Sequence, residues 1–112
     1  MWTIRSEEAA SSEDLPSQVG WRSARAKVLA ERGSFDEALR LAHEAVDLAE
    51  RSDGPAFTGE AALDLAEVLQ LADERRERKV RLEQALELFE QKGVVRQAEQ
   101  ARTRLAELAA EP

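Results

Sequence analysis

Residues 33–45 read GSFDEALRLAHEA, and residues 73–85, forty positions later, read DERRERKVRLEQA. The two stretches differ in charge, but both end on an alanine at the same place, Ala45 in the first and Ala85 in the second. Because neighbouring positions on one helix face recur every three to four residues, shared small and apolar positions predict the same buried face on two helices. The charges that differ are then expected on the solvent side.

The same shift of 40 residues relates apolar positions over most of the chain. The aligned positions are Ala26 with Ala66 and Ala106, Val28 with Val68 and Leu108, Leu29 with Leu69, Ala42 with Leu82, Val46 with Leu86, and Leu48 with Leu88. A fixed period of this kind is typical of helical-hairpin solenoids, in which each repeat buries its apolar face only against its neighbours. The chain is therefore predicted to be all-α, with hairpins stacked side by side and no β-sheet.

Turn residues divide the chain into the expected helices. Gly33 is expected to end one helix in the left-handed conformation, and Ser34 with Glu37 forms an S-x-x-E capping box for the next. Asp53-Gly54-Pro55 and Lys92-Gly93 are further boundaries. The predicted helices cover about residues 2–11, 16–32, 35–51, 56–72, 74–91 and 94–110.

Composition restricts the classes of function. A chain of 112 residues suits one domain, and a net charge of −7 argues against nucleic acid, which needs a surplus of Lys and Arg on one face. No apolar run approaches the roughly 20 residues of a membrane span, and the N-terminus does not resemble a signal peptide. We expect a cytoplasmic protein with neither a membrane nor a nucleic acid as partner.

Catalytic and metal-binding chemistry is not indicated. His43 is the single histidine, no cysteine is present, and no nucleophile or phosphate-loop motif occurs. We interpret His43 as an ordinary surface residue rather than a ligand or base. The carboxylates stand four positions from arginines, as in Glu74 with Arg78 and Glu77 with Arg81, which favours exposed ion pairs over a catalytic pair. We therefore expect no enzyme, no metal and no cofactor.

One basic cluster stands out near the start of a predicted helix. Its members are Arg75, Arg76, Arg78, Lys79 and Arg81. A helix N-terminus favours anions, so the cluster is a candidate for an anionic ligand or an acidic partner surface. The alternative is that these cations only balance the acidic helices around them.

The run Gly33-Ser34-Phe35-Asp36-Glu37-Ala38, followed by Ala42 and Ala45, resembles the tetratricopeptide repeat. The wider sequence resembles the C-terminal helical repeats of bacterial class III adenylate or guanylate cyclases with an ATPase domain, and of maltose-regulator-type transcriptional activators. The resemblance implies a right-handed α–α superhelix with a period of about 40 residues. The expected divisions of this single domain 1–112 are 1–14, a remnant second helix of an upstream hairpin with its turn; 15–53, repeat one; 54–93, repeat two; and 94–112, a C-terminal capping helix. Two departures, Ala38 to Arg78 and Gly33 to Asp73, suggest looser packing at the second corner.

The resemblance also implies a partner-binding groove on the first helices of the hairpins. Carried over by alignment, the groove positions are Ser23, Lys27, Glu31, Glu60, Leu63, Glu67, Gln70, Thr103 and Glu107. Leu63 and Leu71, expected to be exposed, favour a partner helix or self-association as a homodimer. The predicted function is a non-catalytic protein-interaction or self-assembly module of a bacterial signalling or regulatory protein. One alternative is a sensory domain that binds a small effector in the concave face, and another is a fragment without activity of its own.

Overall fold

The structure, a computed structural model, describes residues 14–52 and 54–112 and is entirely helical over these ranges, without a strand. Its five helices are α2 (Leu15–Glu31), α3 (Phe35–Ala49), α4 (Pro55–Leu71), α5 (Arg75–Lys92) and α6 (Val95–Ala110). The prediction of an all-α chain is confirmed for these residues, and each of these helices begins and ends within two residues of its predicted bounds. The lead helix expected at 2–11 lies outside the described residues.

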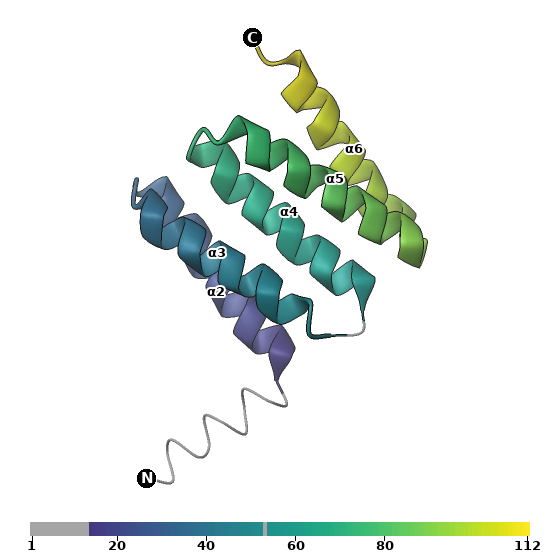
Figure 1. The fold of residues 1–112 in the computed structure, drawn as a ribbon, viewed down its shortest axis with the longest axis horizontal. Coiled ribbons are helices and arrows are strands. Elements are labelled where there is room, and N and C mark those ends of the chain that lie inside the picture. Colours follow the sequence, from purple (N-terminus) through teal and green to yellow (C-terminus); the bar gives the residue numbers. More distant parts are fainter. Residues whose placement is uncertain (1–13, 53) are drawn as a thin grey trace, which may run out of the picture.

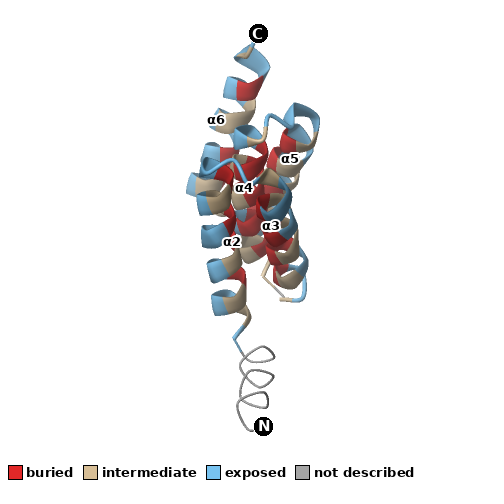
Figure 2. Cartoon of the chain, turned by 90° about the vertical axis from the view of Figure 1, so that its left-hand side faces the viewer, coloured by how far each residue is buried: buried red, intermediate tan, exposed pale blue. Residues whose placement is uncertain are grey.

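The helices form two thin layers. Each helix packs beside the next one in the sequence, and α2 also contacts α4 (Figure 1). In the side view, α2, α4 and α6 lie on one side of the molecule and α3 and α5 on the other (Figure 2). The shortest dimension is 17 Å, which suits two layers of helices about 10 Å in diameter. None of the helices in the described ranges combines the length and the apolar character that a membrane span requires.

The corners after α2 and α4 are built in the same way, forty residues apart. Gly33 has φ 85° and Asp73 has φ 60°, so both residues adopt the left-handed conformation. In each corner the next N–H returns to the end of the helix: Ser34 N donates to Leu29 O at 2.9 Å and Glu74 N to Leu69 O at 2.9 Å. These bonds satisfy carbonyls that a helix end leaves unpaired. The expected left-handed Gly33 is confirmed.

The expected capping box at Ser34 is not formed. The Ser34 side chain makes no capping hydrogen bond, although the residue stands at the N-cap of α3. Glu37 lies instead 3.7 Å from Arg40 on the same helix, measured between Oε2 and Nη2. The side-chain pairing within α3 has therefore replaced the reciprocal cap.

Two apolar clusters make up the core, and α4 contributes to both. Ala61 and Leu65 belong to the cluster shared with α2 and α3, whereas Ala62 and Ala66 belong to the cluster shared with α5 and α6. This arrangement explains the wide apolar stripe of α4, because a helix with neighbours on two sides needs two buried faces. Phe89 of α5 is the largest fully buried side chain.

Several expectations about exposure are wrong. Ala26 and Ala66 are buried as their shared position predicts, but Ala106 is exposed. It lies on α6, which has no further described helix beside it to cover this position. Leu63 is also buried, because its face of α4 packs into the second cluster, whereas Leu71 is exposed as expected.

Candidate functional site: a polar pocket across three helices

A pocket of about 480 Å³ crosses the face formed by α2, α4 and α6, and we call it the polar pocket. Figure 2 shows these three helices on one side of the molecule. The residues that line it are Lys27 from α2, Glu60, Leu63, Asp64 and Glu67 from α4, and Arg96, Gln97, Gln100 and Arg104 from α6. The pocket exists because long polar side chains rise from helices whose small and apolar residues face the core beneath.

Lys27 joins the first two helices of this face. Its Nζ lies 2.8 Å from Asp64 Oδ1 and 3.7 Å from Glu67 Oε1. Burial by itself lowers the pKa of Lys27, but the hydrogen bond and charge of Asp64 and the charge of Glu67 outweigh it, while Arg104 opposes them. The pKa of Lys27 is therefore raised above its ordinary value, and the ammonium is held as a fixed positive charge at neutral pH.

The other charged groups of the polar pocket are available for a ligand. Within the described residues, Arg96, Arg104 and Glu60 form no ion pair, and the pocket has three cationic and three anionic side chains in all. Gln97 and Gln100 add amide groups that both donate and accept. Such a site can bind a ligand that carries donors and acceptors together, rather than a simple ion of one sign.

The polar surface continues along α6. A second pocket of about 310 Å³ shares Arg96, Gln100 and Arg104 with the polar pocket and extends to Thr103 and Glu107. The two hollows together form a strip of polar side chains that crosses α4 and α6 and reaches Lys27 on α2.

The structure places the predicted groove residues in different surroundings. Lys27, Glu60, Leu63 and Glu67 line the polar pocket, Thr103 and Glu107 line its extension, and Glu31 and Gln70 are exposed outside both. Ser23 is buried at 5% exposure, so its expected place on an open groove is wrong. Its small side chain lies, with Phe57 and Ala61 of α4, in the narrow space beside α2.

Sequence analysis missed five residues of the polar pocket, which are Asp64, Arg96, Gln97, Gln100 and Arg104. A signal for three of them was present. Arg96, Gln100 and Arg104 follow one another at intervals of four, which places long polar side chains on one face of a helix. That face was not assigned because alignment with the earlier helices gave only Thr103 and Glu107.

The predicted basic cluster does not act as one patch. Arg78 is buried, and its Nη1 lies 2.9 Å and 3.1 Å from the two carboxylate oxygens of Glu111, so the expected pair with Glu74 is wrong. Arg75 Nη2 donates to the carbonyl oxygens of Leu108 at 2.8 Å and Glu111 at 3.1 Å. These two arginines bind the end of α6, where the helix leaves carbonyls unpaired.

The remaining members of the cluster differ in exposure. Arg81 Nε lies 3.6 Å from Glu77 Oε2, as the sequence predicts, and its Nη1 donates to Gln84 at 2.9 Å. Arg76 and Lys79 are exposed, and neither makes an ion pair with another described residue. Only these two cations of the cluster are therefore free to attract an anion.

His43 is partly exposed and links two helices of the other layer. Its Nε2 lies 3.1 Å from Glu77 Oε2, which connects α3 with α5. Across residues 14–52 and 54–112, no group of three or more His, Asp or Glu side chains is placed to hold a metal ion. Comparison of the chain with family models, curated proteins and solved structures gives no match.

Proposed function

We propose that this chain is a non-catalytic protein-interaction module that holds a peptide or helix of a partner along the α2–α4–α6 face. The observation that carries the proposal is the polar pocket, in which three helices bring together unpaired cations, an unpaired carboxylate and two amides. The proposal includes a right-handed superhelix of tetratricopeptide-like hairpins, supported by the two left-handed corners forty residues apart. It also places the module in a cytoplasmic, bacterial signalling or regulatory protein, for which the sequence resemblance is the support.

A peptide suits the mixed chemistry of this face. Its backbone offers N–H and C=O groups to the amides of Gln97 and Gln100, and its side chains can pair with Arg104 or Glu60. Since positive and negative charges are balanced in the pocket, their pattern selects a partner more than long-range attraction does.

A small effector is the second candidate for the same pocket. A volume of about 480 Å³ falls within the range of small-molecule sites, and several polar groups converge there. An effector would raise the melting temperature of the isolated chain, because ligand that binds only the folded state stabilises it. Self-assembly as a homodimer would appear instead as a mass that rises with concentration in light scattering.

The direct test is selection from a random 12-residue peptide library (roughly four turns if helical) on immobilised protein, followed by calorimetric titration of selected peptides. Arg104→Glu is expected to weaken binding about tenfold, which corresponds to the loss of one useful charge contact. The matched control is Arg51→Glu, which makes the same charge change at an exposed position just beyond α3. Equal effects of the two variants, with both folded by circular dichroism, would rule out the polar pocket as the peptide site.

A further inference from the structure

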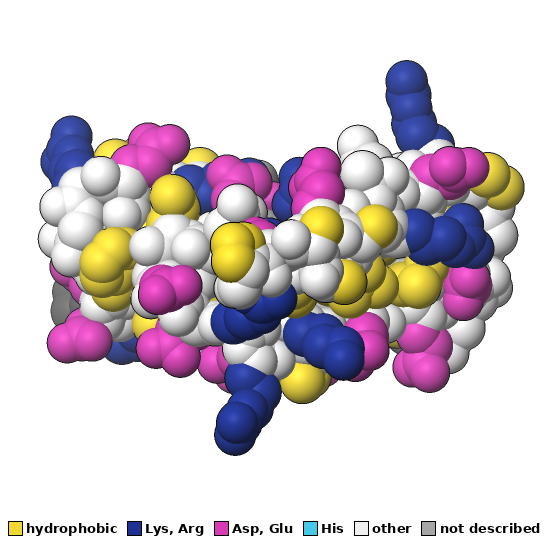
Figure 3. Space-filling view, turned by 90° about the horizontal axis from the view of Figure 1, so that it is seen from above, with side chains coloured by type: hydrophobic (Ala, Val, Ile, Leu, Met, Phe, Trp, Pro, Cys, Tyr) yellow, Lys and Arg dark blue, Asp and Glu magenta, His cyan; other side chains and the backbone are white. Residues whose placement is uncertain are grey.

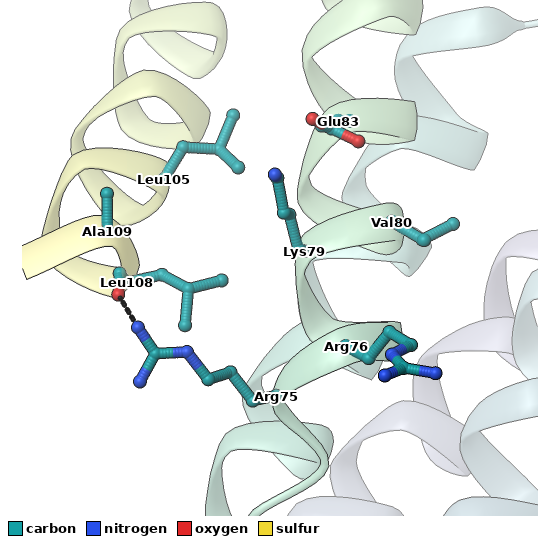
Figure 4. A pocket seen from close by; sticks show the side chains of 8 residues that line it. All are labelled: Arg75, Arg76, Lys79, Val80, Glu83, Leu105, Leu108 and Ala109. Atoms are coloured by element: carbon teal, nitrogen blue, oxygen red, sulfur yellow. Dashed lines mark hydrogen bonds between the residues drawn. The ribbon is translucent and has the colours of Figure 1, made fainter. Parts of the chain in front are cut away.

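A second and larger pocket, of about 680 Å³, lies between α5 and α6, and we call it the α5–α6 groove. Figure 4 shows its side chains at close range. Leu105, Leu108 and Ala109 of α6 form an apolar floor, and Arg76, Lys79 and Val80 of α5 form one wall. Val80 is 54% exposed, so the groove leaves apolar surface in contact with water. Seen from above, hydrophobic side chains and those of Lys and Arg lie next to one another on this end of the molecule (Figure 3).

The floor of the groove has an equivalent forty residues earlier, between α3 and α4, where it is closed. Leu65 and Leu69 are fully buried there. The corresponding Leu105 is only partly buried and Ala109 is exposed. The same part of the repeat is therefore covered at the first junction and open at the second.

The wall residues provide one reason for this difference. Phe35 and Leu39 of α3 pack against the first apolar cluster. The positions forty residues later hold Arg75 and Lys79, which cannot be buried in the same way without losing hydration. The second junction therefore lacks the apolar side chains that fill the first one.

The second reason is that a helix covers the first junction. Helix α5 packs against α4, and its Glu77 reaches His43 on the α3 wall at 3.1 Å. The structure itself thus shows what fits over a floor of this type: a helix whose carboxylate contacts the neighbouring wall.

The charges on the rim indicate the chemistry of a covering helix. Arg75 is engaged by the end of α6 and Arg78 by Glu111, whereas Arg76 and Lys79 have no ion-pair partner in the described part of the chain. In Figure 4, Lys79 projects into the space between α5 and α6. On a chain with a net charge of −7, two free cations beside exposed apolar surface form a locally distinct site.

We propose that the α5–α6 groove docks an amphipathic helix of a partner protein, with an apolar stripe on Leu105 and Ala109 and with Asp or Glu residues beside that stripe. The carboxylates pair with Arg76 and Lys79. Glu83, one turn further along α5, repels an acidic residue at the other end of the groove and so favours one placement of the charges. This surface lies apart from the polar pocket and shares none of its lining residues.

The test uses two synthetic helical peptides of about 18 residues, or five turns, with the same leucine stripe and either Glu or Lys beside it. Fluorescence polarisation with the full chain is expected to show the Glu peptide binding about tenfold more tightly than the Lys peptide, with the difference shrinking at high salt. Equal affinity of the two peptides would contradict the charge argument.

Two double variants make the test specific to the groove. Arg76→Glu with Lys79→Glu is expected to abolish the preference for the Glu peptide, whereas Arg32→Glu with Arg51→Glu makes the same charge change at exposed positions outside the groove and preserves it. Arg104→Glu should leave this binding unchanged, so failure here is distinguishable from failure of the polar pocket. Self-association through the groove, or binding of dodecanoate but of neither peptide, would overturn the assignment to a partner helix.

Discussion

Replacing Gly59 by alanine is expected to destabilise the protein, although glycine is normally the poorer residue inside a helix. Gly59 lies within α4 and is buried. A Cβ atom at this position would stand 2.7 Å from Cε1 and 3.0 Å from Cδ1 and Cζ of Phe89. The Phe89 ring is fully buried, so it has no free space into which it can move. The missing Cβ is therefore what allows α4 and α5 to pack around this ring.

The size of the effect follows from two opposing terms. Gly→Ala in a helix interior contributes about 1 kcal/mol of stability. Forcing an extra carbon into a packed core costs about 1–3 kcal/mol. Since the contact must lengthen by roughly 1 Å to reach an ordinary carbon–carbon separation, we expect the upper part of that range. The net expectation for Gly59→Ala is a loss of about 1 kcal/mol in the free energy of unfolding.

Gly20 provides the matched control. It lies inside α2, and a Cβ there would meet no atom within 4 Å, so Gly20→Ala should stabilise by about 0.5–1 kcal/mol. Urea unfolding followed by far-ultraviolet circular dichroism measures both variants. Adding Phe89→Leu to Gly59→Ala should cost less than the sum of the two single changes, because the smaller side chain makes room for the methyl group. If Gly59→Ala stabilises as much as Gly20→Ala, the argument from ring packing is wrong.

Further expectations concern the corners, the end of α6 and the polar pocket. Asp73→Gly should stabilise by about 0.5–1 kcal/mol in urea unfolding, since it relieves the left-handed backbone at φ 60°, whereas Gly33→Ala should cost about 1 kcal/mol; the same sign for both would contradict the assignment. Arg78→Ala should lower the free energy of unfolding by about 1–2 kcal/mol, less than for a fully buried pair because Glu111 is 38% exposed, and a neutral result would show that the pair is not formed in solution. The pKa of Lys27 is raised above its ordinary value of 10.5, so its contribution to stability is complete below that pH and is lost as pH rises through the folded-state pKa. Unfolding at a series of alkaline pH values should therefore show a steeper loss of stability for the wild type than for Lys27→Met.

Much of the local structure was predictable from the sequence, because helix ends depend on residues close together in the chain. Gly33 and Gly93 end their helices with positive φ, and Pro55 begins α4 as expected. Asp73 shows that the repeat imposes the same left-handed corner even where glycine is replaced. The period of 40 residues also identified Ala45 and Ala85, both fully buried.

Pairs of core residues were not predictable one position at a time. Positions 19 and 49 hold Val19 and Ala49, both buried in the first cluster, and the positions forty residues later hold Gly59 and Phe89. A medium and a small residue have thus been replaced by the smallest residue and a large one. The constraint acts on the volume that two helices share, which no single residue reveals.

The amino-acid sequence by itself determined the helices, their corners and the faces they bury, since these follow from backbone preferences and apolar spacing within a few residues. Only the tertiary structure decided which charges remain available to a partner. Arg78 is neutralised by Glu111, 33 residues away, and Lys27 by Asp64, 37 residues away, whereas Arg76 stays free. A charged side chain pairs with whatever the fold brings within a few ångströms, and that neighbour is set by the packing of helices distant in the sequence.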